Sequence, residues 1–339
     1  MAKITYLFGA GASMNALPIV NQMPERIKGI IDYLKKNKLE LSEMLFFERH
    51  KQELPKNQYY YFNSMIKDFE WLNEESIKHA SIDTYAKKLF IKRDEDKLRA
   101  LKAALSAYFT FEQIINPPDK RYDAFYASLL TEGCIFPNSI SILSWNYDSQ
   151  FELSLAEYSN SKEITVNKDM LNSKIKYERV NSSSEPKSFG VYKINGSAGM
   201  YLANRRLYFH TTDYSSILST SIVSQVVLGY IIEKSFDIVT PTLSFAWEDE
   251  YQNQSIIQSA IENSDDTEIL VVIGYSFPFF NRDIDRKIIG NMKNLKKVYF
   301  QSPDATIINE RFQAIKDNLT GIELVNRFDV EQFLIPNEF

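Results

Sequence analysis

The chain has 339 residues, of which 44% are hydrophobic and 24% charged, the composition of an ordinary globular protein. Its 44 acidic and 39 basic side chains leave a formal net charge of -5, which disfavours nucleic-acid binding across the whole surface. The single cysteine, Cys134, excludes an internal disulfide and a cysteine-rich zinc site, and no apolar run approaches the roughly 20 residues of a membrane-spanning helix. We therefore expect a cytoplasmic protein that uses no metal and does not enter a membrane.

The first predicted element is a short buried strand. Residues Ile4–Phe8 are apolar and rich in strand-forming types, and the run ends at Gly9-Ala10-Gly11-Ala12-Ser13, which predicts a tight turn. Glycine is scarce in this chain, with 11 residues, about half of its average usage. Such a chain should keep glycine where backbone geometry leaves little choice. The turn after the first strand is therefore a place to look for a site.

A long helical region follows. Between residues 24 and 132 the apolar residues recur at helical spacing in roughly five segments, and no segment is a convincing strand. Pro117-Pro118 interrupts the pattern near its end. We therefore predict that residues 24–132 form an all-helical insertion in a domain made of residues 1–23 and 133–339.

Strand patterns resume after this region and alternate with helical ones. The predicted strands are 140–145, 190–194, 238–243, 269–273 and 298–300, and the predicted helices are 222–232, 252–262, 285–292 and 307–315. Residues 159–186 are polar and predict a surface excursion, whereas 322–325 and 328–334 predict an edge strand and a short helix. Strands that alternate with helices indicate an α/β fold with a mostly parallel, Rossmann-like sheet.

Four of the predicted strands and turns end in polar or glycine-rich sequence. In an open parallel sheet, ligands bind beyond the carboxyl ends of the strands, and glycine beside a small or hydroxyl residue lets backbone amides approach a phosphate. The four segments are Gly9-Ala10-Gly11-Ala12-Ser13, Ser144-Trp145-Asn146-Tyr147-Asp148, Asn195-Gly196-Ser197 and Gly274-Tyr275-Ser276. Each alone is also explained by a tight turn, but together they predict a nucleotide site at one edge of the sheet.

Two common kinds of nucleotide site do not fit. The first glycine turn lacks a following Lys-Ser or Lys-Thr, which excludes a P-loop nucleoside triphosphatase. A dehydrogenase site needs a third glycine and a second strand that ends in an acidic residue about 20 positions later. An amphipathic helical pattern from Pro24 to Lys36 occupies that region instead, so hydride transfer is disfavoured.

In their order along the chain, these four segments resemble the sirtuin-like (silent information regulator type) NAD-binding family. The resemblance covers residues 1–20 and about 138–305, and the helical region is similar to insertions in bacterial members. It implies that the cofactor is held by the glycine turn through Gly9, Ala10, Gly11 and Ser13, and by Pro18 in the loop that follows. It further implies contacts from Gly196 and Ser197, from Gly274 and Ser276 to phosphate and ribose, and from Ser302 near the adenosine. It also implies that Asn146 and Asp148 face the nicotinamide ribose.

The assignment of Asn146 and Asp148 also has a chemical basis. Cleavage of the bond between nicotinamide and ribose builds positive charge on the sugar, which a nearby carboxylate or amide dipole stabilises. The amide of Asn146 can further hold ribose hydroxyls or an attacking water. The alternative is that both side chains cap a helix that starts near Ser149.

The chain departs from the family at two points. Family deacetylases hold a zinc ribbon with four cysteines, and this chain has one, so deacetylation is excluded. The family's catalytic histidine is replaced by Asn195, which cannot accept a proton near neutral pH. His210 is our candidate for the missing base, with His79 a weaker one, although a lone histidine is more often structural.

We therefore expect an NAD hydrolase that releases ADP-ribose and nicotinamide. The bacterial relatives without zinc are mostly anti-phage defence effectors, which implies that role, a homo-oligomer and a possible HerA-type ATPase partner. The main alternative is a catalytically silent subunit that binds NAD or ADP-ribose, an alternative that Asn195 favours. A further alternative is that the ligand is a signalling derivative of ADP-ribose.

Overall fold

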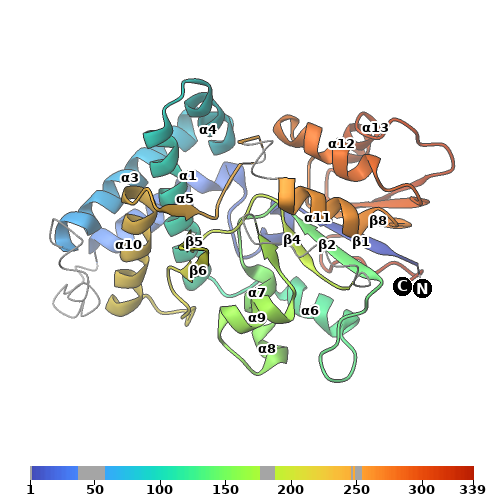
Figure 1. Cartoon of the computed structure of the whole chain (residues 1–339), viewed down its shortest axis with the longest axis horizontal. Coiled ribbons are helices and arrows are strands. Elements are labelled where there is room, and N and C mark those ends of the chain that lie inside the picture. Colours follow the sequence, from blue (N-terminus) through green and yellow to red (C-terminus); the bar gives the residue numbers. More distant parts are fainter. Residues whose placement is uncertain (1, 37–57, 176–187, 246, 249–253) are drawn as a thin grey trace. The chain divides into compact units, whose positions relative to one another are not determined.

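The computed structural model describes residues 2–36, 58–175, 188–245, 247–248 and 254–339 (Figure 1). The chain divides into two compact units. Unit 1 contains Met1–Met14, Pro118–Gly196 and Ala246–Phe339, and unit 2 contains Asn15–Pro117 and Ser197–Phe245. These boundaries differ from the expected division at residues 23 and 132. The helix Lys120–Leu129 belongs with the sheet of unit 1, and a second piece, Ser197–Phe245, joins the helices of unit 2.

Unit 1 is built on a seven-stranded sheet in the order β10-β9-β8-β1-β2-β4-β3. Every pair of neighbouring strands in it is parallel, which confirms the predicted α/β fold with a mostly parallel sheet. The strands are β1 (Ile4–Phe8), β2 (Ile140–Ser144), β3 (Lys174–Ile175), β4 (Val191–Lys193), β8 (Ile269–Ile273), β9 (Lys297–Gln301) and β10 (Glu323–Arg327). The predicted edge strand at 322–325 is β10.

Each face of this sheet is covered by helices and has its own apolar core. Alternate residues of a strand point to opposite faces, so Leu7 of β1 packs in one core and Tyr6 and Phe8 pack in the other. The Leu7 face packs against α11 (Gln254–Ser264), α12 (Arg282–Gly290) and α13 (Ala305–Gln313). The Phe8 face packs against α6 (Lys120–Leu129) and α7 (Gln150–Ser154), while α8 (Ala156–Ser159) and α9 (Ile164–Met170) follow α7 along the chain.

The position of β1 within the sheet singles out one end of it. Strands β2, β4 and β3 extend the sheet on one side of β1, whereas β8, β9 and β10 extend it on the other. The order in which the chain adds strands to the sheet therefore reverses at β1. In open α/β sheets the crevice beyond the carboxyl ends of the strands at such a reversal is the usual ligand site.

Unit 2 combines helices with a small antiparallel sheet in the order β6-β5-β7. Its elements are η2 (Val20–Gln22), α1 (Met23–Lys36), α3 (Gln58–Lys78), α4 (Ile82–Ile91), α5 (Glu95–Ile115), α10 (Thr220–Ser235), β5 (Met200–Ala203), β6 (Arg206–Phe209) and β7 (Val239–Pro241). Side chains of Ser81, Asp94 and Ser219 cap three of these helices, as expected of Ser and Asp at a first turn. The predicted strand 238–243 is therefore correct as a strand but belongs to this small sheet, where β7 pairs antiparallel with β5.

The short helix predicted at 328–334 is not formed, and this prediction was wrong. The side-chain amide of Gln301 replaces helical hydrogen bonding there. Its Nε2 donates to the carbonyls of Asp329 and Gln332, and its Oε1 accepts from the amide of Leu334. Phe333 packs its ring among the aromatic side chains of the Phe8 face. The polar excursion holds α8, α9 and β3 up to residue 175, and its remainder, with residues 37–57 of the helical region, lies outside the described residues.

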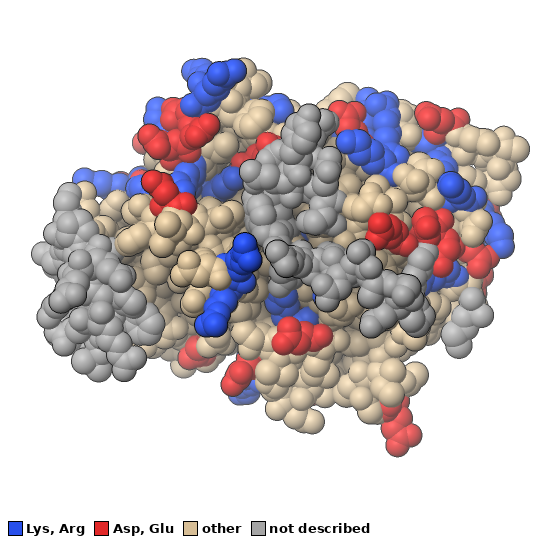
Figure 2. Space-filling view, viewed as in Figure 1, with Lys and Arg blue, Asp and Glu red and all other residues tan. Residues whose placement is uncertain are grey.

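Within the described part of the chain, no helix combines the length and apolarity needed to cross a membrane. Figure 2 shows Lys and Arg side chains interspersed with Asp and Glu over the described residues of one face. This mixture agrees with the small net charge of -5.

Candidate functional site

The parallel register brings the sequence-predicted segments of unit 1 to one edge of the sheet. Phe8, the last residue of β1, is paired with both Ser144 and Ile273, and Ser144 is paired with Lys193. The residues that follow these four positions therefore emerge next to one another at the carboxyl edge of the strands. This edge contains Gly9, Asn146, Asp148, Asn195 and Gly274.

The glycines at this edge allow two backbone segments to touch. We call residues 9–13 the glycine loop; its last four residues form the short helix η1 (Ala10–Ser13). A Cβ on Gly9 would lie 2.6 Å from Cα of Tyr275, and one on Gly274 would lie 2.5 Å from the amide nitrogen of Ala12. Gly274 also has a φ of +60°, which favours glycine. Packing between the two segments thus accounts for these glycines before any ligand is considered.

Hydrogen bonds join the same two segments. The amides of Gly9 and Gly11 donate to the carbonyls of Ile273 and Gly274, both at 3.0 Å, and the amide of Ala12 donates to Gly9 at 2.9 Å. These three amides are therefore directed at protein carbonyls and not at a ligand. Ala10 is the exposed residue of the glycine loop.

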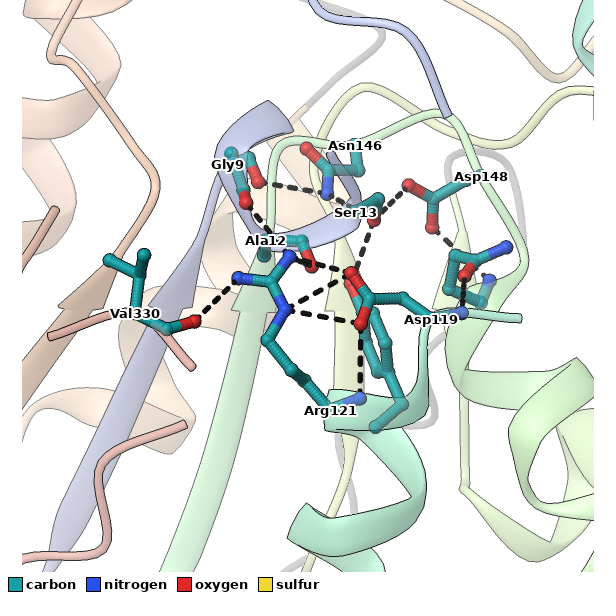
Figure 3. A network of polar contacts seen from close by, with 11 residues as sticks. Gly9, Ala12, Ser13, Asp119, Arg121, Asn146, Asp148 and Val330 are labelled. Atoms are coloured by element: carbon teal, nitrogen blue, oxygen red, sulfur yellow. Dashed lines mark hydrogen bonds and ion pairs between the residues drawn. The ribbon is translucent and has the colours of Figure 1, made fainter. Parts of the chain in front are cut away.

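Ser13 is the centre of a buried polar network at the end of the glycine loop (Figure 3). Its Oγ donates to Oδ2 of Asp148 at 2.8 Å. Because a hydroxyl has one proton to donate, Ser13 then accepts from the Tyr122 hydroxyl at 2.9 Å and from Nδ2 of Asn146 at 3.4 Å. Nδ2 of Asn146 also donates to the carbonyl of Gly9 at 3.0 Å. The network thus joins the predicted residues Ser13, Asn146 and Asp148.

Asp148 is buried, and its surroundings have opposing effects on the pKa of its carboxyl. Burial raises the pKa of the Asp148 carboxyl, while the positive charge of Lys193 and the hydrogen bond from Ser13 oppose that rise. Oδ1 of Asp148 accepts from the amide of Gln150, the first residue of α7, at 3.2 Å, so Asp148 satisfies one amide at the start of this helix, although Ser149 occupies the N-cap position. Asn146 does not share that role, because its amide contacts Gly9 and Ser13.

A buried lysine supports the loop that carries Asp148. Nζ of Lys193 donates to the carbonyl of Asp148 at 2.6 Å and to Oε2 of Glu152 at 2.9 Å. Oε1 of Glu152 accepts from Ser173 at 2.9 Å. Lys193 and Glu152 are both fully enclosed, so this ion pair acts on the shape of the loop and not on a ligand directly.

Asn195 follows β4, and the nitrogen of its side-chain amide has a hydrogen-bond partner whereas the oxygen has none among the described residues. Nδ2 donates to the carbonyl of Trp145 at 3.1 Å. Oδ1 is buried and has no hydrogen-bond partner among the described residues. A buried acceptor without a donor costs about 1–3 kcal/mol. A ligand or water that donates to this oxygen would therefore stabilise the site.

Two of the predicted cofactor-binding serines, Ser276 and Ser302, follow β8 and β9. Ser276 is exposed, and its carbonyl accepts from Nη1 of Arg311 at 2.8 Å. Ser302 is buried, and its Oγ accepts from the amide of Asp304 at 3.2 Å. Both remain at the same edge of the sheet as the glycine loop.

Two of the predicted cofactor-binding residues, Pro18 and Ser197, belong to unit 2. Pro18 is buried just before η2, and Ser197 offers its carbonyl to the hydroxyl of Thr242 at 2.7 Å. Gly196, the residue before Ser197, ends a part of unit 1 with a φ of +73°.

His210 has the surroundings of a structural residue. Its side chain is fully enclosed, with Nε2 3.4 Å from Oε1 of Glu233. A Cβ on Gly229 would lie 2.2 Å from the imidazole, so α10 packs directly on the ring. His79, the weaker candidate, has Nδ1 3.0 Å from the carbonyl of Glu75 and lies against the ring of Tyr85.

The ion pair of Asp119 with Arg121, which contacts the glycine loop, was not predicted from the sequence. Pro117-Pro118 followed by an aspartate is a typical start of a helix, and Asp119 does cap α6 by accepting from the amide of Arg121 at 3.0 Å. That signal could identify the cap. It could not reveal that Arg121 reaches the carbonyls of Gly11 and Ala12.

A second missed feature is the partner of Asp285. Two aspartates lie in the first turn of α12, of which Asp283 is exposed and Asp285 is buried. Oδ2 of Asp285 accepts from the Tyr275 hydroxyl at 2.9 Å. Burial raises the pKa of Asp285 well above its ordinary value, with the hydrogen bond from Tyr275 acting in the opposite direction. Tyr275 also stacks on Trp145 with ring centroids 5.6 Å apart, so this carboxyl supports the segment that touches the glycine loop.

Within the described ranges, no group of three His, Cys, Asp or Glu side chains is placed to hold a metal ion. Comparison with the models of known protein families gives no match, and no curated protein matches the chain. Its function must therefore be argued from the residues of the site.

Proposed function

We propose that the carboxyl edge of the unit 1 sheet binds NAD and that the chain hydrolyses it to ADP-ribose and nicotinamide. The observation that carries this proposal is the anchored amide of Asn146. Nδ2 is held by the carbonyl of Gly9 and by Ser13, which leaves Oδ1 turned away from both (Figure 3). An oriented amide oxygen at the reversal of a parallel sheet suits the recognition of a ribose.

The proposed reaction breaks the bond between C1′ of the ribose and the pyridinium nitrogen of nicotinamide. The bonding electron pair goes to that nitrogen, which becomes neutral, and positive charge develops on the sugar. A water molecule adds its oxygen to C1′ and releases a proton to the solvent. Oδ1 of Asn146 would hold a ribose hydroxyl or this water. The negative charge of Asp148, when ionised, would stabilise the developing cation.

Other residues of the same edge would bind the remainder of the dinucleotide. The buried Oδ1 of Asn195 can accept a hydrogen bond from a ligand donor, which would remove the cost of leaving it unpaired. Exposed Ala10 marks where a diphosphate would approach the glycine loop. Ser276, which follows β8, would contact phosphate and ribose, and Ser302, which follows β9, would lie near the adenosine.

A second function, binding without turnover, is favoured by a specific observation. Both carboxylate oxygens of Asp148 already accept hydrogen bonds from the protein, from Ser13 and from Gln150. Asn195 cannot take a proton, and His210 is enclosed against Glu233. A site without a base suits a subunit that holds NAD, ADP-ribose or a signalling derivative of it.

Nicotinamide release and nucleotide binding separate the two functions. The purified chain would be incubated with NAD, and released nicotinamide would be measured by chromatography. Asn146→Ala should lower turnover by about 100-fold, the effect of removing one oriented dipole. Asn291→Ala, which removes an amide that donates to the carbonyl of Lys287 at the end of α12, is the matched control and should keep full turnover.

Binding of ADP-ribose with no release of nicotinamide would instead establish the silent subunit. Equal turnover by wild type and Asn146→Ala would contradict the proposed role of Asn146. Mass spectrometry of a ligand retained through purification would distinguish NAD from a signalling derivative.

The four-motif resemblance extends the proposal to a biological role. We propose a bacterial anti-phage defence effector that assembles as a homo-oligomer and acts with a HerA-type ATPase. Repeating the turnover assay with and without such an ATPase tests the partnership, and light scattering measures the oligomer. Phage survival in cells that carry wild type or Asn146→Ala tests the role.

A further inference from the structure

Arg121, at the start of α6, places a buried guanidinium against the carbonyls of the glycine loop (Figure 3). Nη2 donates to the carbonyl of Ala12 at 2.9 Å and to that of Gly11 at 3.2 Å. Nη1 donates to the carbonyl of Val330 at 3.2 Å. The side chain is 6% exposed, so these contacts are made out of water.

Asp119 fixes the plane of this guanidinium. Its carboxylate accepts from Nε at 3.1 Å and from Nη2 at 2.6 Å, and the aspartate side chain is 1% exposed. Oδ1 also caps α6 through the amide of Arg121. The carboxylate is therefore held by the helix start and in turn holds the guanidinium.

The orientation of the two loop carbonyls also fixes the orientation of the N–H groups in the same peptide units. A trans peptide is planar, and its carbonyl and its N–H point in opposite directions. The guanidinium that binds the oxygens of Gly11 and Ala12 therefore sets the planes of the peptide units that join Gly11 to Ala12 and Ala12 to Ser13, and directs their N–H groups away from Arg121. The second of these units leads into Ser13, whose hydroxyl contacts Asn146 and Asp148.

We infer that Asp119 and Arg121 form a positioning pair that holds the glycine loop in the conformation needed to bind the dinucleotide. This inference rests on the proposed function. The role is geometric, because the charge of Arg121 is neutralised by Asp119 and both side chains are enclosed. A lysine would keep the charge but not the planar fork that reaches two carbonyls and a carboxylate together.

Two substitutions separate positioning from simple attraction of phosphate. Arg121→Lys keeps the positive charge and loses the fork, whereas Asp119→Asn adds one net positive charge and loosens the guanidinium. Positioning predicts that both raise KM and the Kd for ADP-ribose by about 10-fold, with kcat within about threefold of wild type. Attraction predicts that Arg121→Lys has little effect and that Asp119→Asn tightens binding.

The test measures KM, kcat and the Kd for NAD and ADP-ribose in wild type, both variants and Arg286→Lys. Arg286 is a half-exposed arginine that pairs with Asp283 on α12, and its variant should bind like wild type. Arg121→Gly should regain affinity with added methylguanidine, a rescue that general destabilisation would not give. Amide hydrogen exchange should be faster in residues 9–14 of the variants and unchanged in α12.

Each outcome decides the inference. Binding by both variants within about twofold of wild type, or tighter binding by Asp119→Asn, would overturn it. If Arg121→Lys does not fold, Asp119→Asn alone decides, because it keeps the arginine and its charge and removes only the carboxylate charge that orients the guanidinium. A wild-type chain that binds neither nucleotide contradicts the proposed function itself, and the inference falls with it.

Discussion

Glycines make close approaches possible in both units, but what they approach differs. In unit 1, Gly9 and Gly274 let one backbone segment touch another. In unit 2, Gly229 makes room for the ring of His210. Both contacts lie beside buried polar atoms that have no hydrogen-bond partner among the described residues, Oδ1 of Asn195 in unit 1 and both ring nitrogens of His210 in unit 2. What differs is the position of those atoms: Asn195 follows a strand at the carboxyl edge of the parallel sheet, whereas the side chains of His210 and Glu233 are fully enclosed. A close glycine contact therefore marks a candidate site by its place at the sheet edge and not by unpaired atoms alone.

The largest effects on the free energy of unfolding are expected when the glycines of the two contacts are replaced by alanine. Gly274→Ala should lower the free energy of unfolding by about 3 kcal/mol or more, because the added methyl meets backbone and the φ of Gly274 is positive. Gly229→Ala should cost about 1–3 kcal/mol, because it meets the His210 ring. Urea unfolding measures both, and Gly29→Ala and Gly290→Ala, which meet nothing within 4 Å, are controls expected to be neutral or slightly stabilising.

A double-mutant cycle then separates the two contacts. Combining Gly229→Ala with His210→Ala should cost at least about 1 kcal/mol less than the sum of the single changes, because the second removes the ring that the first strikes. No equivalent exists for Gly274, whose neighbours are backbone atoms. Additive costs at Gly229 and His210 would contradict the contact.

Two buried serines offer a matched comparison of intermediate size. Ser13 donates to Asp148 in unit 1, and Ser106 donates to Glu233 at 3.3 Å in unit 2. Either serine-to-alanine change leaves buried polar groups unpaired and should cost about 1–3 kcal/mol by urea unfolding. Ser13→Ala should also lower NAD turnover by about 100-fold, because it releases Asn146. Ser106→Ala should keep turnover, and a loss there would make His210 and Glu233 part of the reaction.

The smallest expected effect is a difference in pH dependence. Burial raises the pKa of both Asp148 and Glu233 in the folded chain. A carboxyl with a raised folded pKa binds its proton more tightly when folded, so it lowers stability as the pH rises from its ordinary pKa through the raised one. Each unit of raised pKa corresponds to about 1.4 kcal/mol.

The free energy of unfolding, measured from pH 4 to 8, should therefore fall less steeply with pH in Asp148→Asn and in Glu233→Gln than in wild type. Glu310→Gln, at an exposed position of α13, is the control and should follow wild type. Only Asp148→Asn should abolish the fall in NAD turnover at low pH, because the charge of Asp148 is proposed to stabilise the ribose cation. A fall at low pH that persists in Asp148→Asn would exclude that role.

The parallel sheet could be predicted from the sequence because its buried strands are short apolar runs that end at turn residues. Ile4–Phe8 and Ile269–Ile273 are the clearest, and both are strands of the expected length. The strand near residue 239 could be predicted as a strand but not placed. Its partner, Met200–Ala203, is half-buried and pairs with it in antiparallel orientation. No local sequence pattern predicts which strand such a partner is.

The site could be predicted only where its residues follow strands. Ser13, Asn146 and Asp148 were found in this way, and the register explains why they meet. Arg121 was missed because its contact with Gly11 joins positions 110 residues apart through a helix start. The short helix expected at 328–334 failed for a related reason, since a distant glutamine supplies its hydrogen bonds.

The central position of β1 has a consequence for the order of synthesis. Its residue Ile4 pairs with both Ile140 and Ile269, so β1 leaves the ribosome long before one of its two neighbours, β8, has been made. Gly9 finds its acceptor, Ile273, at the end of that same late strand. A nascent chain shorter than this therefore has no complete glycine loop, and contacts this distant in sequence form slowly. The edge that we assign to NAD would be assembled among the last steps of folding, which would keep an unfinished chain from consuming NAD in the cell that makes it.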